Sequence, residues 1–76
     1  MPKAYEEIVY FIAHGNTAGD VAAWMPSEET RQRVADLIDR EKSDSLQPDE
    51  VTELNHYLEL EHLMRLAKAR ASLLYQ

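Results

Sequence analysis

The chain has 76 residues, a net charge of −6 and no cysteine. Its length allows one domain, and the lack of cysteine excludes disulfides and thiolate metal sites. A hydrophobic fraction of 45% is too high for a disordered chain, and the low content of glycine and proline favours helix. We therefore expect a single all-α domain over residues 1–76, in which three short helices pack on one long C-terminal helix.

The first predicted helix covers residues 4–14. Tyr5, Ile8 and Ile12 recur at helical spacing and form an apolar stripe. Gly15 follows this stripe, and glycine readily takes the left-handed conformation that ends many helices. We therefore expect the first helix to end at this glycine.

Two further short helices are predicted over residues 18–25 and 27–42. Thr17 is a candidate N-cap for the first of them, which should end before Pro26 because proline disfavours helical geometry in the preceding residue. Ser27 is the candidate N-cap of the other, and acidic residues follow it in the first turn, where the helix dipole favours anions.

The fourth predicted helix covers residues 48–75 and dominates the chain. Pro48 suits the first helical position, and no helix-breaking residue follows it up to Tyr75. At about 1.5 Å per residue this helix is about 42 Å long. The three preceding helices are too short to cover it, so we expect part of it to project or to pack against another chain.

The second half of this long helix is rich in leucine and alanine. Exposed apolar surface of such extent marks an interface, so this segment predicts a docking surface. The alternative is that the short helices fold back and cover it. The predicted interface residues are Leu60, Leu63, Met64, Leu66, Ala67, Ala71 and Leu74.

Charge is unevenly distributed along the chain. All fourteen acidic residues lie between Glu6 and Glu61, and a basic tail of Arg65, Lys68 and Arg70 follows. An acidic body is suited to attract a basic protein, although solvated surface charge is the simpler interpretation. Three cations in a protein of sequence pI about 4.9 argue against direct nucleic-acid binding.

Candidate chemistry is sparse. Glu59 and His62 have the i, i+3 spacing of helical di-iron carboxylate sites, but the remaining ligands would have to come from a symmetric dimer. A surface contact between the two is the simpler interpretation, and we expect no cofactor. His14 and His56 have no serine or cysteine arrangement typical of nucleophilic catalysis, so we expect a protein that is not an enzyme.

Trp24 has two interpretations. Tryptophan is a common anchor at interfaces, but a chain of this size also needs its largest side chain inside. We favour a place in the core.

The chain has no stretch of about 20 apolar residues that could cross a bilayer. Its first residues are followed at once by Glu6 and Glu7, which does not fit a signal peptide. We therefore expect a cytoplasmic protein with no membrane contact.

Several short motifs resemble those of a group of small bacterial proteins. The similarity is clearest from Tyr57 to Leu66, while Gln47 and the pair Trp24-Met25 depart from the pattern. The residues that carry the similarity are Pro26-Ser27-Glu28-Glu29, Arg33-Val34, Leu37, Leu46, Pro48, Glu50, Glu53-Leu54, 57–66 and Lys68-Ala69-Arg70-Ala71.

Members of that group are encoded beside small nucleases, including ones of the HNH type. The resemblance implies an antitoxin-like or accessory role beside a nuclease and supplies no catalytic residues. Our leading hypothesis is thus a protein-binding module that docks through its long C-terminal helix onto a basic nuclease. A homodimeric structural protein is the alternative, and a dimeric carboxylate metal protein is a lesser one.

Overall fold

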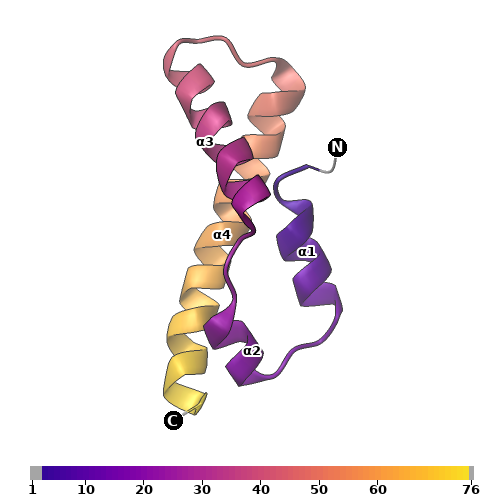
Figure 1. Cartoon of the computed structure of the whole chain (residues 1–76), viewed down its shortest axis with the longest axis vertical. Coiled ribbons are helices and arrows are strands. Elements are labelled where there is room, and N and C mark those ends of the chain that lie inside the picture. Colours follow the sequence, from indigo (N-terminus) through magenta and orange to yellow (C-terminus); the bar gives the residue numbers. More distant parts are fainter. Residues whose placement is uncertain (1–2, 76) are drawn as a thin grey trace.

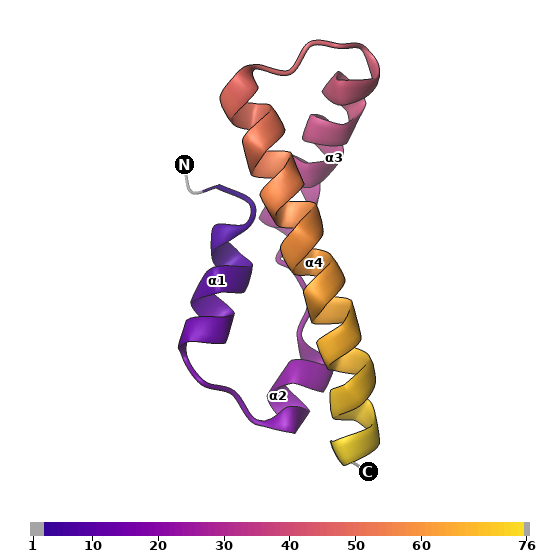
Figure 2. The same cartoon turned by 180° about the vertical axis from the view of Figure 1, so that it is seen from behind.

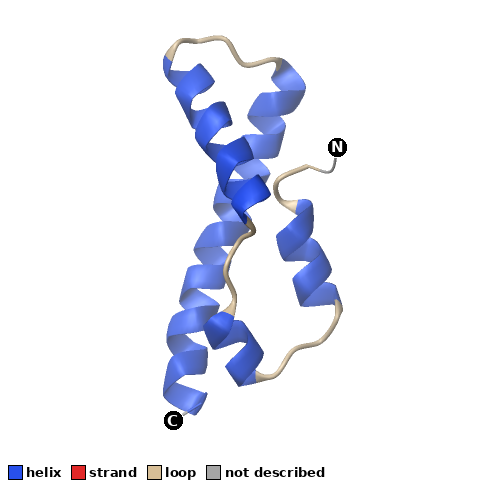
Figure 3. Ribbon diagram, viewed as in Figure 1, coloured by secondary structure: helices blue, strands red, loops and turns tan. Residues whose placement is uncertain are grey.

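The computed structural model describes residues 3–75, which form four α-helices and no strand (Figure 3). The predicted domain also included Met1, Pro2 and Gln76, which lie outside this range. The helices are α1 (Glu6–Ala13), α2 (Ala18–Ala23), α3 (Glu28–Lys42) and α4 (Pro48–Tyr75). Three short helices pack on one long C-terminal helix, which confirms the predicted fold class.

The long helix α4 forms the spine of a molecule that measures 44 × 21 × 19 Å. Figures 1 and 2 show α3 beside its N-terminal half, α1 beside its middle and α2 beside its C-terminal end. The short helices are spread along α4, so the expectation that part of it projects was wrong. The extended linker at residues 24–27 separates α2 from α3, so the two helices reach opposite ends of α4.

Local signals at the helix ends are confirmed. Thr17 and Asp20 form a reciprocal capping box at α2, and the Ser27 side chain accepts a hydrogen bond from the Thr30 N–H at 3.2 Å. Gly15 has φ +67°, the left-handed conformation predicted for it. The helix α2 ends two residues earlier than predicted, because Trp24 is already extended before the proline.

The main core lies between α1, α2 and the part of α4 from its middle toward its C-terminal end. Its buried members are Ala4, Ile8, Tyr57 and Met64, and partly buried apolar side chains surround them. Trp24 is one of these surrounding side chains: it packs against the core and stays partly exposed. At the other end of the molecule, Leu37 of α3 and Leu54 of α4 are also fully buried.

Candidate docking surface

An ion pair between a partly buried arginine and a buried glutamate joins α3 to α4. Arg33 donates to both carboxylate oxygens of Glu53, from Nε at 3.1 Å and from Nη2 at 2.9 Å. The Glu53 side chain is only 2% exposed and also accepts the Ala4 N–H at 2.9 Å. These hydrogen bonds, that of Arg33 first, hold the pKa of Glu53 below its usual value despite its burial. This ion pair was not predicted from the sequence.

A second ion pair lies one turn nearer the start of α4. Arg40 donates from Nη1 to Glu50 Oε1 at 2.9 Å, and the same oxygen accepts the Gln47 N–H at 3.1 Å. The Arg40 hydrogen bond, followed by that of Gln47, lowers the pKa of Glu50 to about 2. Glu50 therefore caps α4 from its third position and ties it to α3, which compensates for the poor capping residue Gln47.

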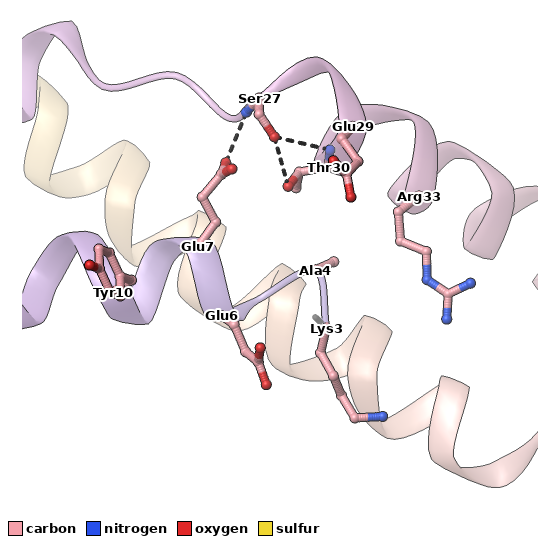
Figure 4. A pocket seen from close by; sticks show the side chains of 9 residues that line it. All are labelled: Lys3, Ala4, Glu6, Glu7, Tyr10, Ser27, Glu29, Thr30 and Arg33. Atoms are coloured by element: carbon pink, nitrogen blue, oxygen red, sulfur yellow. Dashed lines mark hydrogen bonds between the residues drawn. The ribbon is translucent and has the colours of Figure 1, made fainter. Parts of the chain in front are cut away.

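A polar groove of about 340 Å³ separates the start of α1 from the start of α3 (Figure 4). In Figure 4, the Glu7 side chain points across it to Ser27, whose N–H donates to Glu7 Oε1 at 2.8 Å. Ser27 Oγ donates in turn to Thr30 Oγ1 at 3.1 Å. The Ser27 hydroxyl donates to Thr30 and not to the Glu7 carboxylate, which accepts the Ser27 N–H instead. The hydrogen bonds of this serine serve the fold.

The predicted interface residues divide into two groups. Met64 and Ala71 are buried, and Leu60 and Ala67 are partly buried. These four point toward the other helices, because α2 and α1 pack against this side of α4. They cannot belong to an exposed docking surface, and the predicted surface is corrected to the remaining three residues and their neighbours.

Val51 and Leu58 are exposed in the first half of α4, and four more leucines are exposed in its second half, away from the side that Met64 and Ala71 share. Leu63 is 52% exposed and Leu66 58%, while Leu73 and Leu74 reach 70% and 73%. Spacings of three, seven and eleven residues return to nearly the same side of an α-helix, so these leucines share one face. We call Leu63, Leu66, Leu73 and Leu74 the outer leucine face. Leu73 was absent from the predicted interface residues.

The three residues of the predicted basic tail have different surroundings. Lys68 donates from Nζ to the Trp24 carbonyl at 2.7 Å and so binds the C-terminal end of α2 to α4. Arg65 pairs with Glu61 one turn away, with Nε and Oε1 2.8 Å apart. Arg70 is exposed and forms no ion pair within residues 3–75. Arg65 is also exposed, but of the two only Arg70 lacks an ion-pair partner among the described residues.

The structure gives the candidate metal ligands Glu59 and His62 no companions. Both side chains are exposed on α4. Among residues 3–75, no group of three or more histidine or acidic side chains is placed to hold a metal ion. The described helices also include none with the length and apolar character that a membrane span requires.

Comparisons with known proteins leave the family open. No protein-family model, curated protein or solved structure matches this chain. The resemblance to proteins encoded beside HNH-type nucleases therefore stays a prediction that rests on the sequence motifs alone.

Proposed function

We propose that this protein is a non-catalytic protein-binding module that docks through the outer leucine face. The observation that carries the proposal is the exposure of four leucines on one side of a regular helix. Isolated exposed leucines are common on protein surfaces, but a group on one helix face is typical of an interaction site. Met64 and Ala71, on the other side of α4, are buried in the protein's own core. Docking through the outer leucine face therefore requires no rearrangement of that core.

The proposed role is antitoxin-like or accessory to a nuclease, with a basic nuclease as the partner. The net charge of −6 supports a basic partner, because opposite charges steer two proteins together and raise their association rate. Glu6 and Glu29 are exposed beside the groove between α1 and α3, where they add to this acidic surface. The nuclease itself is suggested by the sequence resemblance.

The experiment is to mix the protein with the nuclease encoded beside its gene and to measure binding and nuclease inhibition. The variant Leu66→Glu places a charge in the outer leucine face and should weaken the complex by at least about tenfold. The matched control is Val51→Glu, which is also exposed on α4 but lies four turns from Leu66. Equal binding by the wild-type protein and Leu66→Glu would contradict docking through this face.

A homodimeric structural protein is the second candidate, and one observation favours it. Along α4 the acidic residues end at Glu61 and the basic ones begin at Arg65. A helix with opposite charges in its two halves is complementary to an inverted copy of itself.

A further inference from the structure

The outer leucine face carries one exposed charge of each sign. Glu59 lies seven residues before Leu66, and Arg70 lies four residues after it. Seven residues are close to two helical turns and four are close to one, so both charges project from the same side as Leu66. Within the described residues, neither charge has an ion-pair partner in its own chain. The face therefore presents leucines between an acidic end and a basic end.

This order of charges distinguishes the two ways in which a pair of α4 helices can lie side by side. In a parallel pair, each residue meets its own copy, so Glu59 faces Glu59 and Arg70 faces Arg70. Like charges at such distances destabilise an interface. In an antiparallel pair the sequence runs in opposite directions, so the acidic end of one helix lies on the basic end of the other.

We propose that the outer leucine face is occupied by a second copy of this chain, antiparallel, with a two-fold axis beside Leu66. This proposal rests on the proposed function: it keeps the same docking face but covers it with a second copy, and a basic partner then meets the acidic surface beside the groove between α1 and α3. With Leu66 at the axis, the two Leu66 side chains meet. Leu63 then faces the partner's Ala69, and Glu59 faces the partner's Leu73 with Arg70 one turn away. Two symmetric Glu59–Arg70 pairs thus border a leucine contact.

The arrangement of the helices leaves room for this pairing. Seen from behind, α4 lies in front of α3 (Figure 2), so the short helices do not cover its outer side. The exposure of Leu63, Leu66 and Leu73 agrees with this view. A face that contains its own charge complement fits a two-fold interface, in which the same patch is used by both copies. Small domains also commonly gain stability by oligomerisation.

The dimer keeps the acidic groove accessible. No residue of α4 lines the groove between α1 and α3, so the outer leucine face and the groove share no residue. Glu6 and Glu29, which are exposed beside the groove, therefore stay outside the interface in each copy. A basic partner would meet two such surfaces in one particle, which strengthens binding through multivalency.

Single cysteine variants test the pairing, since the chain has no cysteine of its own. Under mild oxidation, Leu66→Cys should form a disulfide-linked dimer, because only residues beside the axis bring their own copies within disulfide range. Asn55→Cys is the matched control on the same helix side. In an antiparallel pair, the two cysteines at position 55 lie about 33 Å apart and cannot link. In a parallel pair, the same two cysteines lie in contact. A mixture of Glu59→Cys and Leu73→Cys should form the mixed disulfide.

Charge reversal gives an independent readout. Glu59→Arg and Arg70→Glu should each weaken dimerisation by about tenfold, and the double variant should restore it. Efficient linkage of Asn55→Cys, or failure of Leu66→Cys to link, would overturn the antiparallel dimer. If the dimer is overturned in this way but Leu66→Glu still loses nuclease binding, the proposed docking function is supported without the dimer. If Leu66→Glu also leaves nuclease binding unchanged, the proposed function fails with the dimer.

Discussion

Arg33 of α3 holds Glu53 of α4 through two hydrogen bonds of 3.1 and 2.9 Å, one to each carboxylate oxygen. The same carboxylate accepts the backbone N–H of Ala4, just before α1. One side chain therefore joins three segments that are far apart in the sequence. The orientation of α1 and α3 around α4 depends on this buried glutamate, and so does the shape of the groove between them.

Removal of this carboxylate should destabilise the fold. We expect Glu53→Ala to lower the free energy of unfolding by about 2–4 kcal/mol, because it leaves a partly buried guanidinium and a buried N–H without their acceptor. Urea denaturation followed by circular dichroism measures the change. Glu41→Ala, at an exposed position of α3, is the control and should stay within about 0.5 kcal/mol of wild type. A loss for Glu53→Ala as small as that of the control would contradict its role.

Acid should weaken the contact between α3 and α4. The pKa of Glu50 is lowered from 4.5 to about 2, chiefly by the Arg40 hydrogen bond. A carboxylate with a depressed pKa in the folded state contributes stability above its unfolded pKa, and this contribution disappears as the pH falls through the folded pKa. Thermal midpoints should therefore fall between about pH 4.5 and pH 2. Glu50→Gln should show a shallower fall, and an equally steep fall would refute this assignment.

Lys68 should hold α2 on the end of α4. Its Nζ donates to the Trp24 carbonyl at 2.7 Å, so Lys68→Met removes a charged donor while it keeps the apolar stem. We expect a loss of about 1–2 kcal/mol in local stability, seen as faster hydrogen exchange of the α2 amides. Arg65→Ala is the control, because an exposed pair one turn apart contributes at most about 0.5 kcal/mol. Unchanged exchange in α2 would show that this contact is dispensable.

Gly15 should be required for its backbone conformation alone. Its φ of +67° is strained for any residue with a Cβ, yet a Cβ added there would have no atom within 4 Å. We expect Gly15→Ala to cost about 1–2 kcal/mol in the free energy of unfolding, and Gly15→Asn to cost less because asparagine tolerates this conformation. Chemical denaturation of the two variants measures both. An equal cost would mean that the strain is not the cause.

The elements that sequence reasoning located correctly depend on local signals. Thr17 and Ser27 cap helices through hydrogen bonds to residues within one turn, and Gly15 ends a helix through its own backbone conformation. Such local effects can be predicted from the sequence. The position of α2 beside the end of α4 depends on contacts across the whole chain. This is why Met64 and Ala71 were predicted to face a partner, although α2 and the core bury them.

The buried glutamate was missed for a related reason. Glu53 lies beside Leu54 in an acidic stretch of α4, where a glutamate is expected to face solvent. Only the approach of Arg33 and of the Ala4 N–H makes its burial favourable, and both come from other segments. The available signal was its spacing of seven residues, about two helical turns, from the predicted apolar position Leu60.

The mass of the protein in solution tests the central claim, that the outer leucine face is covered by a second copy. Sedimentation equilibrium from about 1 µM to about 1 mM spans the affinities expected of such an interface. We predict that the wild-type protein approaches twice its chain mass of 8.8 kDa, while Leu66→Glu stays at the chain mass with an unchanged helical spectrum. A wild-type mass of 8.8 kDa at every concentration would contradict the dimer.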